Sequence, residues 1–250
     1  MTFTYSSAET NIQHSLLLAA FSSELTKCIL SGERHKMNNN DKDLLYDLHN
    51  YGANLDTREI FLHNYYTSGD DENPGVEYKM SNTFLKNLRA LELKSDKPIL
   101  IHMQSVGGEW SDGMAIYDAI TMSKCHITII AYGQAESMSS IIFQAADSRL
   151  ITPNTYFMSH YGSSSAGGHY LNVQNWIKYE KYICDIMLDI YASQCVNGPY
   201  FLEKYGKGAT TKVKNYLNTK LKSGDWYINA EDAVYYGFAD KVIDSWQKIN

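Results

Sequence analysis

Residues 98–108, PILIHMQSVGG, join an apolar strand to a turn of two glycines. Two further apolar strands end in short motifs of their own: HITIIAY (126–132) leads into GQAESM (133–138), and TYFMSH (155–160) ends on a histidine. Helical patterns follow the first two of these strands. Alternation of strand and helix predicts mostly parallel strands joined by right-handed crossovers, so the expected fold class is α/β.

The composition is that of an ordinary globular protein of 250 residues, with 44% hydrophobic and 20% charged residues. This length allows one large α/β domain, or a domain with an appendage. The formal net charge is −6 and the Lys and Arg residues are scattered, so we expect no nucleic-acid partner. The sequence shows no signal-peptide pattern and no stretch near the roughly 18 apolar residues of a membrane helix. We therefore expect a cytoplasmic protein with no membrane association.

Cysteine and histidine show no metal-binding pattern. The four cysteines, Cys28, Cys125, Cys184 and Cys195, form no CxxC pair, and the eight histidines form no HExxH set. Free thiols in a reducing compartment are expected. No Walker A glycine loop is present either. The sequence predicts neither a metal nor a cofactor.

Residues 1–57 differ in pattern from the rest of the chain. A helical pattern runs from Ile12 to Leu25, a polar stretch at 37–43 predicts a loop, and residues 44–48 predict a short helix. We expect 1–57 to be a separate helical arm, or a pore or interaction region. Residues 58–250 are expected to form the main domain.

The main domain shows further signals of strands, loops and helix starts. Residues 59–63 predict a first strand, and the acidic stretch 67–75 predicts an exposed loop. Ser81 and Ser111 are predicted to cap the next two helices. The longest helical pattern, 171–195, carries a wide apolar stripe, which predicts that this helix closes a core or packs against another subunit.

Three polar residues could carry out acyl transfer: Ser137, His160 and Asp225. Ser137 opens a helix after a strand, His160 ends a strand, and Asp225 precedes the apolar strand WYI (226–228). In such a set the serine attacks, the histidine moves its proton, and the aspartate holds the imidazole tautomer. Each also has a plain structural interpretation, as a helix N-cap, a hydrogen-bonded histidine at a strand end and a turn aspartate.

The two glycines at 107 and 108 supply a further requirement of this chemistry. Acyl transfer needs backbone N–H groups aimed at a developing oxyanion, and glycines let a backbone approach the substrate closely. A turn of two glycines is weak evidence alone. The order of all these motifs along the chain carries the argument.

From about Glu59 to Ile243 the chain resembles the proteolytic subunit of the Clp protease (ClpP), a self-compartmentalising serine peptidase. In that family a strand leads into SPGG and a helix containing GMxIYD, matched here by SVGG (105–108) and GMAIYD (113–118). The family motif GQAxSM matches 133–138. The patterns around the family's histidine and after its aspartate are matched by TPNTYFMSH (152–160) and AVYYGFAD (233–240).

The resemblance implies a ClpP/crotonase-like fold, a repeated β-β-α spiral with a protruding handle helix at 171–195. It implies Ser137 as nucleophile, His160 as general base and Asp225 as the residue that orients the base. The N–H groups of Gly108 and Met138 would form the oxyanion hole. The implied protein is a serine endopeptidase that cleaves unfolded polypeptides without metal or cofactor. Its implied partners are itself, in heptameric rings stacked to a tetradecamer, and an ATP-dependent AAA+ unfoldase.

The chain departs from the family pattern at several places. Val106 replaces a proline, Glu136 stands where a small residue is usual, and YG (161–162) replaces Gln-Pro after the histidine. Residues 65–75 and 196–223 are longer than in the family, and the first 57 residues do not match it.

Three other interpretations of the chain are considered. The chain could be a catalytically silent ring subunit with a structural or regulatory role. It could be a crotonase-type acyl-CoA enzyme, which shares the oxyanion-hole chemistry. It could also be a Ser/Lys peptidase with Lys178 or Lys181 as the base.

Overall fold

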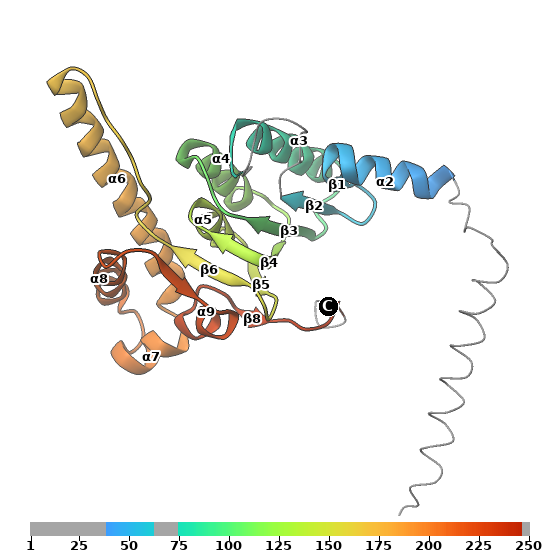
Figure 1. The fold of residues 1–250 in the computed structure, drawn as a ribbon. Helices are drawn as coiled ribbons and strands as arrows, with labels where there is room; N and C mark the ends of the chain where they lie inside the picture. The colour runs from blue at the N-terminus through green and yellow to red at the C-terminus, as the bar shows by residue number, and fades with distance from the viewer. Residues whose placement is uncertain (1–38, 63–74, 247–250) are drawn as a thin grey trace, which may run out of the picture. The chain divides into compact units, whose positions relative to one another are not determined.

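The computed structural model describes residues 39–62 and 75–246 (Figure 1). Contacts between residues group the chain into two units, Met1–Tyr46 and Asp47–Asn250, and the second unit contains the whole sheet.

The N-terminal predictions have mixed outcomes. The helical pattern from Ile12 to Leu25 and most of the loop predicted at 67–75 lie outside the described residues. The helix predicted at 44–48 is confirmed as α2 (Asn39–Tyr51). The loop predicted at 37–43 is wrong from Asn39 onward, because the helix already begins there.

One mixed sheet organises the second unit, in the order β1-β2-β3-β4-β5-β8, with β6 pairing both β4 and β7. The β1–β2 and β6–β7 pairs are antiparallel and the others are parallel, which confirms the α/β prediction. The strands are β1 (Ala53–Asn54), β2 (Glu59–Leu62), β3 (Ile99–Ser105), β4 (Ile127–Glu136), β5 (Ser148–Ile151), β6 (Tyr156–Ser159), β7 (Trp226–Ile228) and β8 (Lys241–Val242).

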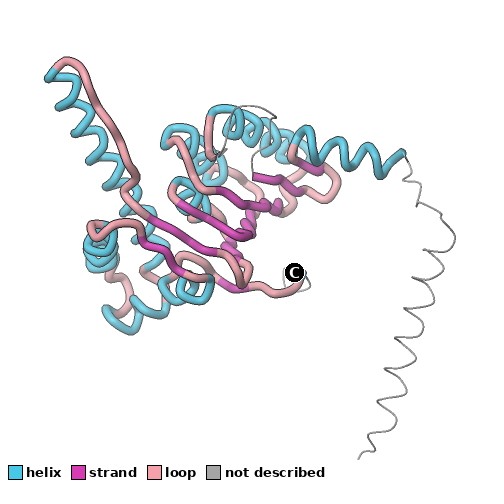
Figure 2. Tube along the Cα trace, viewed as in Figure 1, coloured by secondary structure: helices cyan, strands magenta, loops and turns pink. Residues whose placement is uncertain are grey.

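Seven helices of the described chain follow α2. They are α3 (Tyr78–Lys94), α4 (Trp110–Thr121), α5 (Met138–Phe143), α6 (Tyr170–Cys195), α7 (Pro199–Tyr205), α8 (Thr210–Leu221) and α9 (Ala230–Tyr236). Figure 2 shows α3 and α4 together on one side of the strands. The helix that the sequence predicted to open at Ser137 is confirmed as α5, which is short and ends at Phe143.

β4 is the longest strand, and it changes partner along its length. Residues Thr128–Ala131 pair with β5, whereas Gln134–Glu136 pair with β6. Gly133, with a φ of 60°, stands between the two segments. Because β4 and β6 run parallel there, Ser137 and His160, which follow these two strands, come to the same edge of the sheet.

The main core lies on one face of the sheet. Alternate residues of β3 and β4 are buried against α3, α4 and α5, as expected for strands with one helix-covered face. The buried side chains of this layer include Ile99, Ile101, Met103, Ile127 and Ile129 from the strands and Phe84, Leu88, Ile116 and Phe143 from the helices. The opposite face has a smaller cluster of Ile130, Leu150 and Ile243.

The two helix caps predicted at serines are wrong. α3 begins at Tyr78, where the Glu77 carboxylate accepts a hydrogen bond from the Met80 N–H at 3.1 Å, and Ser81 lies inside the helix. α4 begins at Trp110, so that Ser111 also lies inside its helix. An isolated parallel bridge explains both starts: it pairs Val76 with Gly108, two residues before each helix.

α6 has 26 residues, and its two halves differ in environment. The C-terminal half, from Met187 to Cys195, is packed into the core. The N-terminal half extends away from the sheet (Figure 1). Its exposed large side chains are Tyr170, Leu171, Trp176, Ile177, Tyr179 and Tyr182. The stripe read from the sequence therefore serves the core over half the helix and is exposed over the other half.

Candidate active site

Ser137 sits at the junction of β4 and α5 with a positive φ of 52° and a ψ of −124°. Its N–H donates to the Met158 carbonyl at 2.9 Å, and its carbonyl accepts from the N–H and the hydroxyl of Ser140 at 3.0 and 2.6 Å. Its side chain makes no capping hydrogen bond to α5. The plain N-cap interpretation is therefore wrong, and the hydroxyl is left for another partner.

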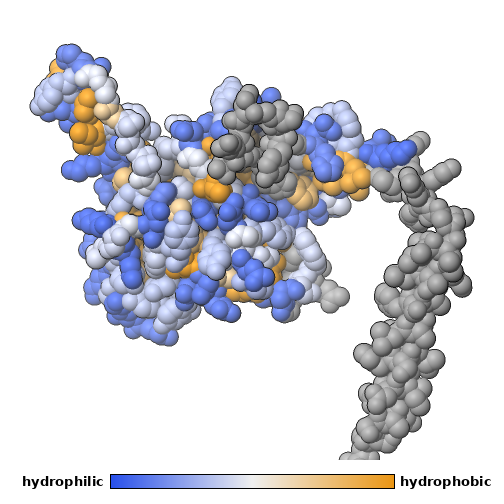
Figure 3. Space-filling view, in the orientation of Figure 1, coloured by the Kyte–Doolittle hydropathy of each residue, from blue (hydrophilic) through white to orange (hydrophobic). Residues whose placement is uncertain are grey.

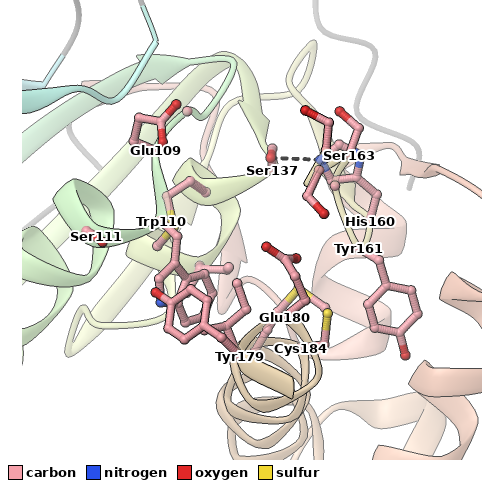
Figure 4. Close-up of a pocket in the computed structure, with 18 of the residues that line it drawn as sticks. Glu109, Trp110, Ser111, Ser137, His160, Tyr161, Ser163, Tyr179, Glu180 and Cys184 are labelled. Atoms are coloured by element: carbon pink, nitrogen blue, oxygen red, sulfur yellow. Dashed lines mark hydrogen bonds between the residues drawn. The ribbon is translucent and has the colours of Figure 1, made fainter. Parts of the chain in front are cut away.

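That partner is His160. The Ser137 Oγ lies 2.8 Å from His160 Nε2, and His160 Nδ1 lies 3.0 Å from Asp225 Oδ1 (Figure 4 shows the first contact). Ser159 pairs with Trp226 in antiparallel strands. His160 follows Ser159 and Asp225 precedes Trp226, so this pairing brings His160 and Asp225 together. The three candidate residues thus form one continuous hydrogen-bonded chain.

The glycine turn lies against the start of α5. A side chain on Gly107 would come within 2.6 Å of the Glu136 carbonyl oxygen and 2.7 Å of the Met138 nitrogen. Two hydrogen bonds connect Val76 to this turn. The Val76 N–H donates to the Gly107 carbonyl at 2.5 Å, and the Val76 carbonyl accepts from the Glu109 N–H at 2.8 Å. Only glycine fits at such an approach, with φ of 92° at Gly107.

Two N–H groups remain available beside Ser137. Met138 is the first residue of α5, so its N–H has no acceptor within the helix. The Gly108 N–H donates to no described part of the chain. Both residues line the same cavity as Ser137 and His160. These are the two donors that the family resemblance implies for an oxyanion hole.

Hydrogen bonds of buried serines hold the glycine turn and the Ser137 backbone in place. The Ser139 hydroxyl donates to the Ser105 hydroxyl at 2.7 Å, and the Gly107 N–H donates to the same oxygen at 3.3 Å. The hydroxyl of Ser140, which holds the Ser137 carbonyl, lies 2.6 Å from the Tyr191 hydroxyl on α6. Sequence reasoning missed these supporting residues, since their partners are distant in the chain.

Glu136 adds a negative charge next to the three residues. Its carboxyl is half-buried, and this burial raises its pKa above the usual value. Attraction to His160 acts in the opposite direction, and repulsion from Asp225 raises the pKa further. Glu136 therefore lies within electrostatic reach of both residues, although it is bonded to neither.

A cavity of about 330 Å³ opens beside Ser137 (Figure 4). Its walls come from the glycine turn, the start of α5, the stretch after His160 and one side of α6. The sequence did not indicate that Trp110, Tyr179 and Glu180 would line this cavity. Helical spacing placed Trp176, Ile183 and Met187 on one stripe, but no local signal says that this stripe faces Ser137.

The two lysines considered as alternative bases do not line this cavity. Lys181 lines a second cavity beside Lys222 and Asn218, and Lys178 lines neither. Cys125, Cys184 and Cys195 are free thiols. Within residues 39–62 and 75–246 no group of three His, Cys, Asp or Glu side chains could hold a metal ion. Over the same residues, no helix has the length and apolar character needed to cross a membrane.

Comparison with known proteins gives one consistent family. The Clp protease family model matches residues 72–246. The ATP-dependent Clp protease proteolytic subunit 2 of Pseudomonas aeruginosa is 29% identical over 177 residues, covering 70% of this chain and 80% of the relative. The proteolytic subunits of Deinococcus radiodurans and Streptococcus suis are each 27% identical, covering 68% of this chain and 76% and 81% of the relatives. The fold and these matches agree: the chain belongs to the Clp protease family.

Proposed function

We propose that this protein is a serine endopeptidase. The supporting observation is the chain of contacts from Ser137 Oγ to His160 Nε2 and from His160 Nδ1 to Asp225, at 2.8 and 3.0 Å. The Ser137 oxygen attacks a peptide carbonyl carbon, and its proton passes to His160 Nε2. Asp225 accepts the Nδ1 hydrogen bond throughout and stabilises the imidazolium that forms.

The negative charge that develops on the carbonyl oxygen is held by the N–H groups of Gly108 and Met138. When the tetrahedral intermediate collapses, the amine leaves with the proton from His160, and an acyl group stays on Ser137. Water then attacks this ester and gives a proton to His160, which passes it to the Ser137 oxygen as the carboxylic acid product leaves. Every proton is therefore carried by residues of this chain.

A serine-reactive fluorophosphonate probe tests this proposal. We expect the wild-type protein to be labelled and to cleave a short fluorogenic peptide. Ser137→Ala should abolish labelling, and His160→Ala should reduce peptide turnover by about 10⁴-fold or more. Lys178→Ala and Lys181→Ala serve as controls and should retain turnover. Loss of activity in a lysine variant but not in His160→Ala would point to a Ser/Lys peptidase instead.

We further propose the assembly that the family resemblance implies. Residues 58–250 would form the peptidase domain and pack into heptameric rings that stack to a tetradecamer, with residues 1–57 as an interaction region. An ATP-dependent AAA+ unfoldase would deliver unfolded polypeptides in the cytoplasm. Native mass spectrometry of the full chain measures the subunit number. A ring that the probe does not label would favour the silent-subunit alternative, and a monomer would contradict the proposed assembly.

A further inference from the structure

The cavity beside Ser137 combines apolar, aromatic and acidic walls. Ile141, Ile183 and Met187 supply apolar surface next to the nucleophile. Trp176 and Tyr179 stand together on α6, with ring centroids 5.7 Å apart, and both line the cavity. A long aliphatic side chain would find apolar contacts along most of its length.

Glu180 provides the charge in this cavity. Figure 4 shows its carboxylate pointing away from α6 into the cavity. The side chain is half-buried and makes no hydrogen bond or ion pair with the described residues. Its charge also reaches the neighbouring Cys184, whose pKa is raised by burial first and then by Glu180 and Asp185.

Among the described residues, no lysine or arginine accompanies Glu180 in the lining of the cavity beside Ser137. Glu109 is a second carboxylate in the lining. Lys181 and Lys222 line a second cavity, which Glu180, Trp176 and Cys184 also line, but neither lysine forms an ion pair with Glu180 in the described part of the chain. Lys214 is already paired with Asp185 and Asp189, at 3.1 and 2.7 Å.

We propose that Glu180 makes this site select peptides with lysine or arginine beside the scissile bond. This inference rests on the proposed peptidase function. The methylene stem of such a residue packs on Ile141, Ile183 and Met187, as long cationic side chains do on apolar surfaces. Its charged end pairs with the Glu180 carboxylate, flanked by the aromatic side chains of α6.

An apolar occupant fits the cavity less well. It would cover Glu180 and strip water from a carboxylate without supplying a partner, which is costly. A cationic occupant removes that cost and adds a charge-assisted hydrogen bond. The arrangement therefore discriminates by charge as well as by size.

Peptide binding to Ser137→Ala protein tests the inference without hydrolysis. Three peptides are compared, with arginine, citrulline or norleucine before the scissile bond, since citrulline matches arginine in shape but is neutral. We expect the arginine peptide to bind about tenfold more tightly than the citrulline peptide by calorimetry, with the difference shrinking as salt rises. Glu180→Gln in the same background should bring the ratio of the two Kd values close to one.

Glu203→Gln is the matched control, because Glu203 lies on α7, outside the cavity, and bonds to Tyr235. It should keep the full preference for arginine. Equal binding of arginine and citrulline, tighter binding of norleucine, or a preference that survives Glu180→Gln would overturn the inference.

Parallel probe labelling of protein with Ser137 intact separates the two proposals. Labelled, active protein without an arginine preference would leave the peptidase standing and remove the role of Glu180. Arginine-selective binding by a protein that the probe never labels would support the role of Glu180 and refute the peptidase.

Discussion

At the scale of single residues, the conformation of Ser137 is the most unusual feature of the site. A serine with φ of 52° is uncommon, and such strain costs roughly 1–3 kcal/mol. Its own backbone bonds to Met158 and Ser140 hold it there. The sequence identified the residue, but its conformation depends on β6 and on Tyr191 of α6, so no local pattern could predict it.

Gly107→Ala should disable the site without removing any of its side chains. The added Cβ would press on Ser137 Cβ and the Met138 nitrogen, at 2.6 and 2.7 Å, in a backbone conformation that alanine disfavours. We expect the rate of fluorophosphonate labelling to fall by about 100-fold or more, as when an oxyanion donor is lost. Gly167→Ala is the control, because a Cβ there meets nothing within 4 Å. Equal labelling of both variants would contradict the placement of the oxyanion hole.

Glu136→Gln should change the pH dependence of peptide turnover. The ionised carboxylate and protonated His160 attract each other. Glu136→Gln removes this attraction, so we expect activity to extend to lower pH. The acid limb of the kcat/KM profile should therefore move to lower pH, whereas Glu203→Gln should leave it in place. A shift to higher pH would show that Glu136 does not act through this charge.

At the scale of elements, the strands were largely predictable, but the starts of two helices were not. The apolar runs of β2 to β6 are visible in the sequence, because buried strands alternate or run continuously apolar. The starts of α3 and α4 follow from the bridge between Val76 and Gly108, a contact across 32 residues of sequence. The division of β4 between two partners likewise depends on strands that come later in the chain.

Arg149 lies on β5 and bonds to the turn before β8. Asp240→Asn tests how much these contacts stabilise the fold. The side chain of Arg149 is only 9% exposed; it donates to the Gln144 side chain and the Gly237 carbonyl and forms an ion pair with Asp240. Removing the charge of Asp240 leaves a buried guanidinium without its anion. We expect the free energy of unfolding in urea to fall by about 1–2 kcal/mol.

The exposed pair of Lys94 and Asp56 provides the comparison. These side chains are 49% and 95% exposed, so water and salt screen their attraction. Asp56→Asn should change the free energy of unfolding by less than about 0.5 kcal/mol. Similar losses in both variants would mean that Arg149 does not depend on Asp240.

At the scale of the whole molecule, the exposed apolar half of α6 is the main candidate for self-association. Figure 3 shows hydrophobic surface on this part of the chain, and Leu171 and Ile177 are each 55% exposed there. Exposed apolar patches of this kind mark interaction surfaces. The sequence showed the stripe, but its period could not say which half would face solvent.

Ile177→Asp should therefore weaken assembly of the full chain. A charge in a buried apolar contact is costly, so we expect a smaller mass by light scattering coupled to size-exclusion chromatography. Asn175→Asp adds the same charge two residues away at a position that is already polar, and should keep the wild-type mass. Identical masses for both variants would place the subunit contact elsewhere.

α6 also links peptide binding in the cavity to the association of subunits. One helix carries the cavity wall at Tyr179, Glu180 and Ile183 and the exposed apolar surface at Leu171 and Ile177. A neighbour that steadies this helix and a peptide that rests against it act on the same element. If each lowers the ordering cost that the other would meet, each strengthens the other's binding, and thermodynamic reciprocity makes the two factors equal. Bound substrate would therefore strengthen subunit association and its release would weaken it. The stability of the oligomer would then depend on how many of its sites are occupied.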